Sequence, residues 1–271
     1  MRVFFASQPN HLPLLRRCGV TNYLISYFYL KDPEIYKRFF LPTDKLIIDS
    51  GAFSAWTTGG SVNLDEYIEF CKKLRAIMDC EIYFVNLDVI PGGFGVKPTK
   101  EQVEESAAKG WENYEKMKSN GLKVIHIFHQ HEDFKWLDKL SASSDYIGIS
   151  PANDQSVKVR TIWLEKVFSR LPKGIKTHCF GLTAAKVMKL FPFFSCDSSS
   201  WLVGARYGIK LVWNGNTLQT TSKRSHNKKT LNRLQCYKMN GQEFNKANIL
   251  ETLKFQNYIS KLWEARNLKF Y

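Results

Sequence analysis

Short apolar runs alternate with segments of helical periodicity along most of the chain, and this alternation restricts the possible folds more than any other feature. The runs are almost continuously hydrophobic, which is typical of parallel strands covered on both faces. We predict eight such strands: Val3–Ala6, Lys45–Asp49, Ile82–Leu87, Val124–Phe128, Tyr146–Ile149, Lys176–Cys179, Phe193–Cys196 and Ile209–Trp213. Eight strands with intervening helices predict an α/β protein of the (β/α)8 TIM-barrel type, which needs ~250 residues.

The predicted helices fill most of the gaps between these runs. Apolar residues recur at helical spacing from Leu64 to Met78 behind an Asn63 cap, and from Val103 to Tyr114 behind Thr99. Trp163–Leu171 and Ala184–Leu190 are further candidates. An open doubly wound sheet is the alternative fold, but no Gly-x-Gly-x-x-Gly follows the first strand.

The length of 271 residues fits one barrel domain over residues 1–271. Its last part, residues 214–271, differs in composition. Thr220–Lys238 is polar and basic, and a helix is expected around Phe244–Ala265. We expect this basic segment and helix to pack on the barrel rather than to form a second domain.

Basic residues outnumber acidic ones, 39 to 25, which gives a formal charge of +14. Such an excess favours a polyanionic partner, namely nucleic acid, an anionic membrane face or an acidic protein, although a basic protein without such a partner is the simpler alternative. The basic segment supplies candidate contacts to phosphates, or it is only a solvated polar loop. Its charged residues are Lys223, Arg224, His226, Lys228, Lys229, Arg233 and Lys238.

The six cysteines form no Cys-x-x-Cys pair, and a chain of this size needs no disulfide framework, so we expect reduced thiols. The first residues do not have the pattern of a signal peptide, and no run approaches the ~20 apolar residues of a membrane span. The expected location is the cytoplasm, or the host cytoplasm if the protein is viral, with no membrane partner. No motif calls for a redox cofactor or a nucleoside triphosphate.

Three carboxylates follow predicted strands at their C-terminal ends, where barrel enzymes carry their catalytic groups. They are Asp49, Asp88 and Asp197. Any one of them could simply cap a helix, but three around one opening favour a shared site. Two close carboxylates suit glycosidic chemistry, in which one attacks the anomeric carbon and the other moves a proton.

Histidines occur at positions 126, 129 and 131 along one predicted strand. We interpret this spacing as alternation that puts the three side chains on one side of the strand. A metal site is one reading, and a polar lining of the barrel opening is the favoured one, since no carboxylate spacing accompanies them.

These strand ends resemble the tRNA-guanine transglycosylase family, and in particular its DNA-acting relatives in phages and bacteria, the DNA-guanine transglycosylases. The family block Asp-Ser-Gly-Gly-Phe/Tyr is similar to Asp49–Phe53, and His-x-Met-Gly is similar to His178–Gly181. The nucleophile segment of the family aligns without a gap on Asp197–Gly208. Asp197, Ala205, Arg206 and Gly208 match, whereas Trp201-Leu202-Val203 replace a Pro-Thr-Arg centre.

The resemblance implies a barrel fold and a role for each matching residue. Asp197 would be the nucleophile on C1′ of the target nucleotide, and Asp49 the general acid/base that deprotonates the incoming base. Asp88 and Gln130 would bind the edge of guanine. The other implied contacts to the base are Ser50, Phe53, Gly148, Phe180 and Gly181, with Phe53 and Phe180 on the two faces of the ring.

Two departures from the family bear on these implications. Gly148 matches one glycine of a Gly-Gly pair, but Ile149 replaces the second. The tRNA enzymes also carry a Cys-x-Cys-x-x-Cys and His zinc site after the barrel, where this chain offers only His226 and Cys236, so we predict no such zinc. We expect Arg206, Lys223, Arg224, Lys228, Lys229 and Arg233 to contact the nucleic-acid backbone instead.

The leading functional prediction is a glycosyltransferase (pentosyltransferase) that replaces guanine in DNA with a free 7-deazaguanine base, such as 7-cyano-7-deazaguanine or a relative. The same chemistry on tRNA is the first alternative. A barrel that binds nucleic acid without catalysis, as one half of a heterodimer, is the second, and a hydrolase that releases the base to water is the third. The sequence is compatible with a homodimer or with a partner protein.

Overall fold

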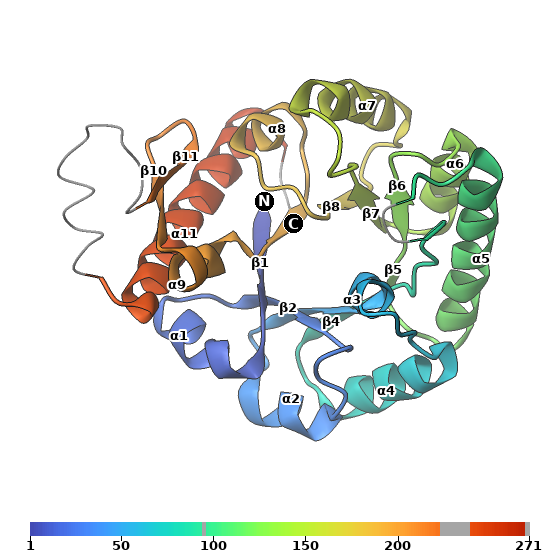
Figure 1. Ribbon diagram of the computed structural model, residues 1–271, viewed down its shortest axis with the longest axis horizontal. Helices are drawn as coiled ribbons and strands as arrows, with labels where there is room; N and C mark the ends of the chain where they lie inside the picture. Colours follow the sequence, from blue (N-terminus) through green and yellow to red (C-terminus); the bar gives the residue numbers. More distant parts are fainter. Residues whose placement is uncertain (94–95, 223–238, 269–271) are drawn as a thin grey trace.

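A parallel β-sheet that curls into a nearly closed barrel forms the centre of the structure, and helices surround it (Figure 1). The computed structural model describes residues 1–93, 96–222 and 239–268. The strands of the barrel are β1 (Arg2–Ser7), β2 (Asn22–Ser26), β3 (Lys45–Asp49), β4 (Glu81–Val85), β5 (Val124–Ile125), β6 (Ile127–His129), β7 (Tyr146–Ser150), β8 (Lys176–Cys179) and β9 (Ser195–Ser198).

The strands lie in the order β5-β4-β3-β2-β1-β9-β8-β7-β6. β5 and β6 are consecutive and only His126 separates them, so one segment pairs with β4 through its first half and with β7 through its second half. Because β5 and β6 together occupy one position, the nine strands fill eight positions around the barrel. The predicted TIM-type α/β barrel is confirmed.

The prediction was wrong about which eight segments form the barrel. β2 was not predicted, because its burial alternates along the strand instead of being continuous. The segment Ile209–Trp213, predicted as the eighth strand, is β10 and lies outside the barrel, where it pairs antiparallel with β11 (Leu218–Ser222). Only Leu211 of β10 is buried, which fits a two-stranded hairpin rather than a barrel strand. β9 also begins two residues later than predicted.

The helices begin where the sequence offers caps. Asn63 Oδ1 accepts the backbone N–H of Asp65 at 2.9 Å and of Glu66 at 3.1 Å, and Thr99 forms a reciprocal capping box with Gln102. The helices are α1 (Leu12–Arg17), α2 (Pro33–Phe39), α3 (Ala52–Thr57), α4 (Leu64–Ile77), α5 (Lys100–Ser119), α6 (Phe134–Ser143), α7 (Val157–Arg170), α8 (Ala185–Leu190), α9 (Val203–Tyr207) and α11 (Gly241–Ala265), with 3-10 turns η1 (Pro9–His11) and η2 (Ser200–Leu202).

Side-chain alternation along the strands separates two apolar layers. On β3, Ile47 faces the barrel interior, whereas Leu46 and Ile48 belong to the larger cluster between strands and helices. The interior holds Phe4, Ile47, Val85, Ile125, Ile127, Tyr146 and Phe194, so the lower part of the barrel is filled rather than open. The side chains that could face a ligand are therefore those at the carboxyl ends of the strands.

The last helix, α11, closes the ring of helices on the side of β1 and α8 (Figure 1). The Val3 backbone N–H donates to Gln256 Oε1 at 2.7 Å, and Trp263 Nε1 donates to the Met188 carbonyl at 2.8 Å. Asn248 Oδ1 accepts the Leu211 N–H at 2.7 Å and so fixes β10 to the same helix. In the described part of the chain, no helix has both the length and the hydropathy of a membrane span.

Gly204 allows α9 to approach α11, and its replacement tests this packing. A Cβ at position 204 would lie 2.6 Å from Phe244 Cβ and 2.9 Å from Asn248 Nδ2. We expect Gly204→Ala to lower the free energy of unfolding by about 1–3 kcal/mol, because the helices must move apart. Denaturant unfolding measures this, with Gly60→Ala as control, since its Cβ would make only ordinary contacts. Equal stability of the two variants would contradict the tight packing.

Candidate active site at the carboxyl ends of the strands

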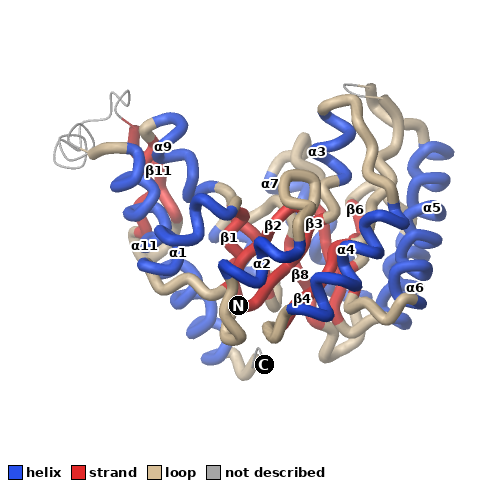
Figure 2. Tube along the Cα trace, turned by 90° about the horizontal axis from the view of Figure 1, so that it is seen from below, coloured by secondary structure: helices blue, strands red, loops and turns tan. Residues whose placement is uncertain are grey.

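The three carboxylates singled out in the sequence come together at the mouth, the barrel opening at the carboxyl ends of the strands. Asp49 is the last residue of β3, Asp88 follows β4 by three residues, and Asp197 lies in β9. Asp88 and Asp197 are both close enough to Asp49 to raise the pKa of its carboxyl group. Figure 2 shows α3, which directly follows β3, standing beyond the strands at this end.

Asp49 has the electrostatics of a proton-transfer group. Burial is the largest cause of its raised pKa, and the negative charges of Asp88 and Asp197 add to it, so that the pKa reaches about 6. The hydrogen bond from the Gly51 amide, whose nitrogen lies 3.1 Å from Asp49 Oδ2, and the nearby Ser26 hydroxyl act in the opposite direction. A carboxyl with a pKa near 6 can both release and accept a proton near neutral pH.

The turn after Asp49 requires glycine at position 51. Gly51 has a φ of +77°, and a Cβ there would lie 2.4 Å from Phe28 Cβ. This turn buries Ser50 and starts α3 at Ala52, which leaves Phe53 67% exposed beside Trp56. The Asp-Ser-Gly block therefore positions the carboxylate and an exposed aromatic ring together.

Asp197 is held through one of its two oxygens. The Gly181 N–H donates to Asp197 Oδ1 at 3.2 Å, and His178 Nε2 lies 3.5 Å from the same oxygen. Among the described residues, none donates a hydrogen bond to Oδ2. The carboxylate thus presents Oδ2 as its free oxygen, as a nucleophile requires.

Asp88 forms an ion pair with His129, whose Nε2 lies 3.2 Å from Asp88 Oδ2. Burial lowers the pKa of His129, but the charge of Asp88 and its hydrogen bond to the ring outweigh burial and raise the pKa to about 9. Glu132 Oε2 accepts the His129 backbone N–H at 3.1 Å, and burial raises the pKa of Glu132 to about 7. This side of the mouth therefore carries a protonated His129 at neutral pH.

The prediction that His126, His129 and His131 share one side was wrong. Positions 126 and 129 are three residues apart and so face opposite sides of the strand. His126 points away from the interior, contacts Asn86 Nδ2 at 2.9 Å and stacks on Tyr114 of α5, and its burial lowers its pKa to about 4. His131 is exposed beyond β6. No cluster of three metal-ligating side chains occurs among residues 1–93, 96–222 and 239–268.

The residues assigned to the base are partly engaged with the protein itself. Gln130 Oε1 accepts the Ala152 N–H at 2.9 Å, which leaves its amide protons for a ligand. Gly148 lies under Phe180, because a Cβ at position 148 would be 2.8 Å from Phe180 Cε2. The Phe180 ring lies against His178, at 4.3 Å between centroids and with the ring planes tilted by 52°, rather than facing Phe53.

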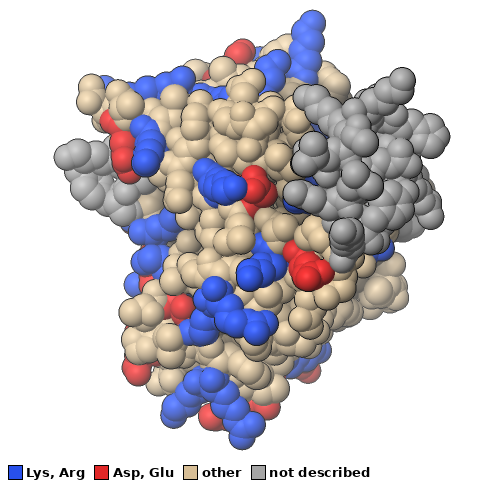
Figure 3. Space-filling view, turned by 90° about the vertical axis from the view of Figure 1, so that its left-hand side faces the viewer, with Lys and Arg blue, Asp and Glu red and all other residues tan. Residues whose placement is uncertain are grey.

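The predicted backbone contacts are placed only in part. Arg206 is exposed on α9, where its charge adds to burial in lowering the pKa of His11. Lys and Arg side chains are spread over the face of α1, α9 and α11 with fewer acidic ones between them (Figure 3). Lys223, Arg224, Lys228, Lys229 and Arg233 lie outside the described residues, as do His226 and Cys236.

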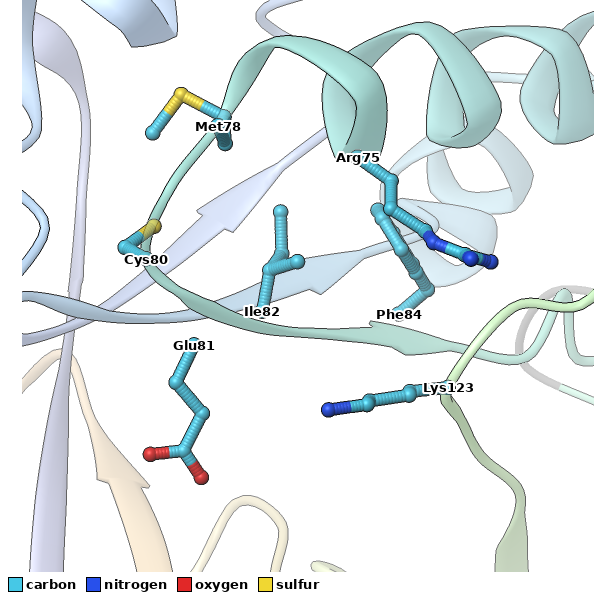
Figure 4. A pocket seen from close by; sticks show the side chains of 7 residues that line it. All are labelled: Arg75, Met78, Cys80, Glu81, Ile82, Phe84 and Lys123. Atoms are coloured by element: carbon cyan, nitrogen blue, oxygen red, sulfur yellow. The ribbon is translucent and has the colours of Figure 1, made fainter.

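Two cavities lie at the opposite end of the barrel. One of about 140 Å³ is lined by Arg75, Cys80, Glu81 and Lys123 at the start of β4 (Figure 4), and one of about 330 Å³ adjoins it near Tyr83 and Asp145. Because catalytic groups of barrel enzymes stand at the carboxyl ends of the strands, the mouth and not these cavities is the candidate active site.

The sequence analysis assigned no role to three buried polar residues beneath the mouth, although His178 is the first residue of the His178–Gly181 motif. Tyr146, His178 and Ser195 are 3%, 0% and 0% exposed and contact one another inside the barrel. The available signal was the alternation of side chains along β8, in which His178 shares its face with Lys176 and not with an apolar residue. Ser26, which lies on the unpredicted β2, was missed with that strand.

The sequence matches no protein-family model and none of the curated proteins with which it was compared. The resemblance to the guanine transglycosylases therefore rests on the short sequence motifs and stays a prediction.

The raised pKa of Asp49 predicts a pH-dependent cost to stability. Its pKa of about 6 exceeds the ordinary 3.8. The contribution of the protonated Asp49 carboxyl to the free energy of unfolding is therefore fully present below about pH 4 and is lost as the pH rises through 6. We expect Asp49→Asn to unfold with a free energy about 1–3 kcal/mol higher than wild type at pH 8, and with nearly the same free energy at pH 4. Asp79→Asn, at an exposed position before β4, is the control. A difference that does not vary with pH would contradict this electrostatic environment.

Proposed function

We propose that this chain is a base-exchange transglycosylase that replaces guanine in DNA with a 7-deazaguanine base through a covalent Asp197 intermediate. The observation that carries the proposal is the meeting of Asp49, Asp88 and Asp197 at one barrel mouth, with the pKa of Asp49 raised to about 6. A nucleophile with a free oxygen and a proton-transfer group next to it are what an exchange at an anomeric carbon requires.

The reaction can be written with these groups alone. Asp197 Oδ2 forms a bond to C1′ of the target nucleotide while the C1′–N9 bond breaks, and the electron pair goes to guanine, which takes a proton from Asp49. The incoming base then loses its N9 proton to Asp49 and attacks C1′. The C1′–Oδ2 bond breaks and its electron pair returns to the Asp197 carboxylate. Two displacements retain the configuration at C1′.

Recognition of the base uses the opposite side of the mouth. Asp88 retains one oxygen not paired with His129, which can accept N–H groups of a guanine edge, while Gln130 offers its amide protons. Phe180 supplies a ring for stacking, a contact worth ~1–3 kcal/mol per base. A base must leave the stack to reach this recess, as in other enzymes that act on bases.

DNA is favoured over tRNA as the polymer by the sequence. The tRNA enzymes hold RNA through a zinc-containing element, and this chain has only Cys236 and His226 in the corresponding region. The charge of +14 and the Lys and Arg residues around α9 and α11 support a phosphate-binding surface (Figure 3).

Incorporation of labelled guanine tests both the chemistry and the polymer. We expect the purified protein to transfer radiolabelled guanine into duplex DNA and not into bulk tRNA. Label in tRNA alone would keep the chemistry and refute DNA as substrate, and label in neither polymer would refute base exchange by this chain alone. Free guanine released without uptake of label would identify a hydrolase.

Asp197→Asn provides the matched test of the nucleophile. We expect this variant to lose incorporation by at least about 10³-fold and to form no denaturation-resistant protein–DNA adduct, because an amide cannot form the ester. Asp49→Asn should bind DNA as wild type does and exchange slowly. A persistent adduct in Asp197→Asn would exclude Asp197 as the nucleophile.

The basic segment is tested by the salt dependence of DNA binding. Replacing Lys223, Arg224, Lys228 and Lys229 with Gln should weaken binding and make the slope of log K against log [salt] shallower by about 3.6, since each of the four phosphate contacts contributes ~0.9. An unchanged slope would show that the phosphates bind elsewhere. The control replaces four lysines on the other side of the barrel: Lys72, Lys109, Lys116 and Lys135.

A further inference from the structure

A chain of buried polar groups runs from the barrel interior to Asp197. Tyr146 Oη lies 2.6 Å from Ser195 Oγ, which lies 2.7 Å from His178 Nδ1. The other ring nitrogen, His178 Nε2, lies 3.5 Å from Asp197 Oδ1 and has no hydrogen-bond partner among the described residues. The Tyr146 ring belongs to the apolar filling of the barrel and the other two groups adjoin it, in surroundings where an unsatisfied polar group is costly.

The register of the sheet makes room for this chain. Gly148 of β7, His178 of β8 and Ser195 of β9 are neighbours across three adjacent strands. The two small residues flank the imidazole, and the Phe180 ring covers the space above Gly148. His178 is thus confined by packing as well as by hydrogen bonds.

The order of hydrogen bonds determines where the imidazole proton lies. If Tyr146 donates to Ser195 and Ser195 donates to His178 Nδ1, both hydroxyl protons have acceptors and the ring proton is on Nε2. In the reverse order the Tyr146 proton has no acceptor among the described residues. An unprotonated Nε2 would also lie beside the Asp197 carboxylate, which places two hydrogen-bond acceptors next to each other without a proton between them. Both arguments favour the Nε2–H tautomer.

We propose that His178 is a positioning residue for Asp197, with its Nε2–H directed at Asp197 Oδ1 and with Tyr146 and Ser195 fixing that tautomer. The catalytic part of this inference rests on the proposed function. Two donors, Gly181 N–H and His178 Nε2–H, share Oδ1 and leave Oδ2 to bond with C1′. When the C1′–Oδ2 bond breaks, negative charge returns to the carboxylate, and the same two donors stabilise it. The 3.5 Å contact shortens in that state.

The tautomer is measured without any substrate. In protein labelled with ¹⁵N in the imidazole rings, we expect His178 to show a protonated Nε2 and an unprotonated Nδ1 that accepts a hydrogen bond. His178→Gln assigns the signal by removing it. Ser195→Ala should shift the Nδ1 resonance as its donor is lost, and Tyr146→Phe should do so less. A proton on Nδ1 in the wild-type enzyme would overturn the proposal, whatever the reaction catalysed.

Kinetics separate positioning from general structural damage. We expect His178→Ala to lower kcat for guanine incorporation by about 100-fold with KM changed by about twofold or less. His178→Gln should retain about tenfold more activity than His178→Ala, because its amide can donate from the position of Nε2. Thr177→Val is the matched control, since Thr177 is buried on the outward face of the same strand and its hydroxyl has no hydrogen-bond partner in the described part of the chain.

The measurement of the tautomer and the kinetic comparison together distinguish failure of this inference from failure of the proposed function. Wild-type protein that incorporates no base but shows the Nε2–H tautomer would refute base exchange and keep the orientation of His178 toward Asp197. Active wild type with His178→Ala as active as Thr177→Val would refute the positioning role and keep base exchange.

Discussion

The pairing of the segment 124–129 with two different strands is the constraint on which the rest of the structure depends. Its first half bonds to β4 and its second half to β7, with His126 between them. This double pairing closes the sheet into a barrel, so that Asp49 at the end of β3 and Asp197 in β9, two strands separated by β2 and β1, stand at one opening. His126 is itself held outside the barrel by Asn86 and Tyr114, so packing against α5 contributes to closing the sheet.

Closure creates an electrostatic conflict at the mouth that the protein resolves unevenly. Asp88 is paired with His129, and Asp197 accepts the Gly181 N–H. Burial and the charges of these two neighbours raise the pKa of Asp49. The raised pKa of Asp49 allows its carboxyl to exchange a proton near neutral pH, and the three carboxylates differ in the groups that contact them.

Local rules in the sequence were sufficient for the barrel class, the helix caps and the three carboxylates. The Asp-Ser-Gly turn is readable because only glycine tolerates the backbone at position 51. The identity of the strands was less accessible, because β2 is short and alternating while the β10 segment has a similar apolar content but pairs only with β11. Which face a histidine takes was also misjudged for His126, since a position three residues from His129 reverses the direction of its side chain. The contact of His178 with Asp197 depends on register between strands, which no local pattern encodes.

Gly148 illustrates how a residue matched by motif gains a physical role from its surroundings. The resemblance places its backbone against the base, yet in the structure the absence of its side chain admits the Phe180 ring, which lies against His178. An apolar ring in this position excludes water from the imidazole, and a lower local dielectric strengthens the attraction between Nε2–H and the Asp197 carboxylate. The ring that is proposed to stack on the base therefore also shields the contact between His178 and Asp197. A side chain at position 148 would displace Phe180 and weaken both functions together, which explains why the smallest residue stands in the middle of a buried strand.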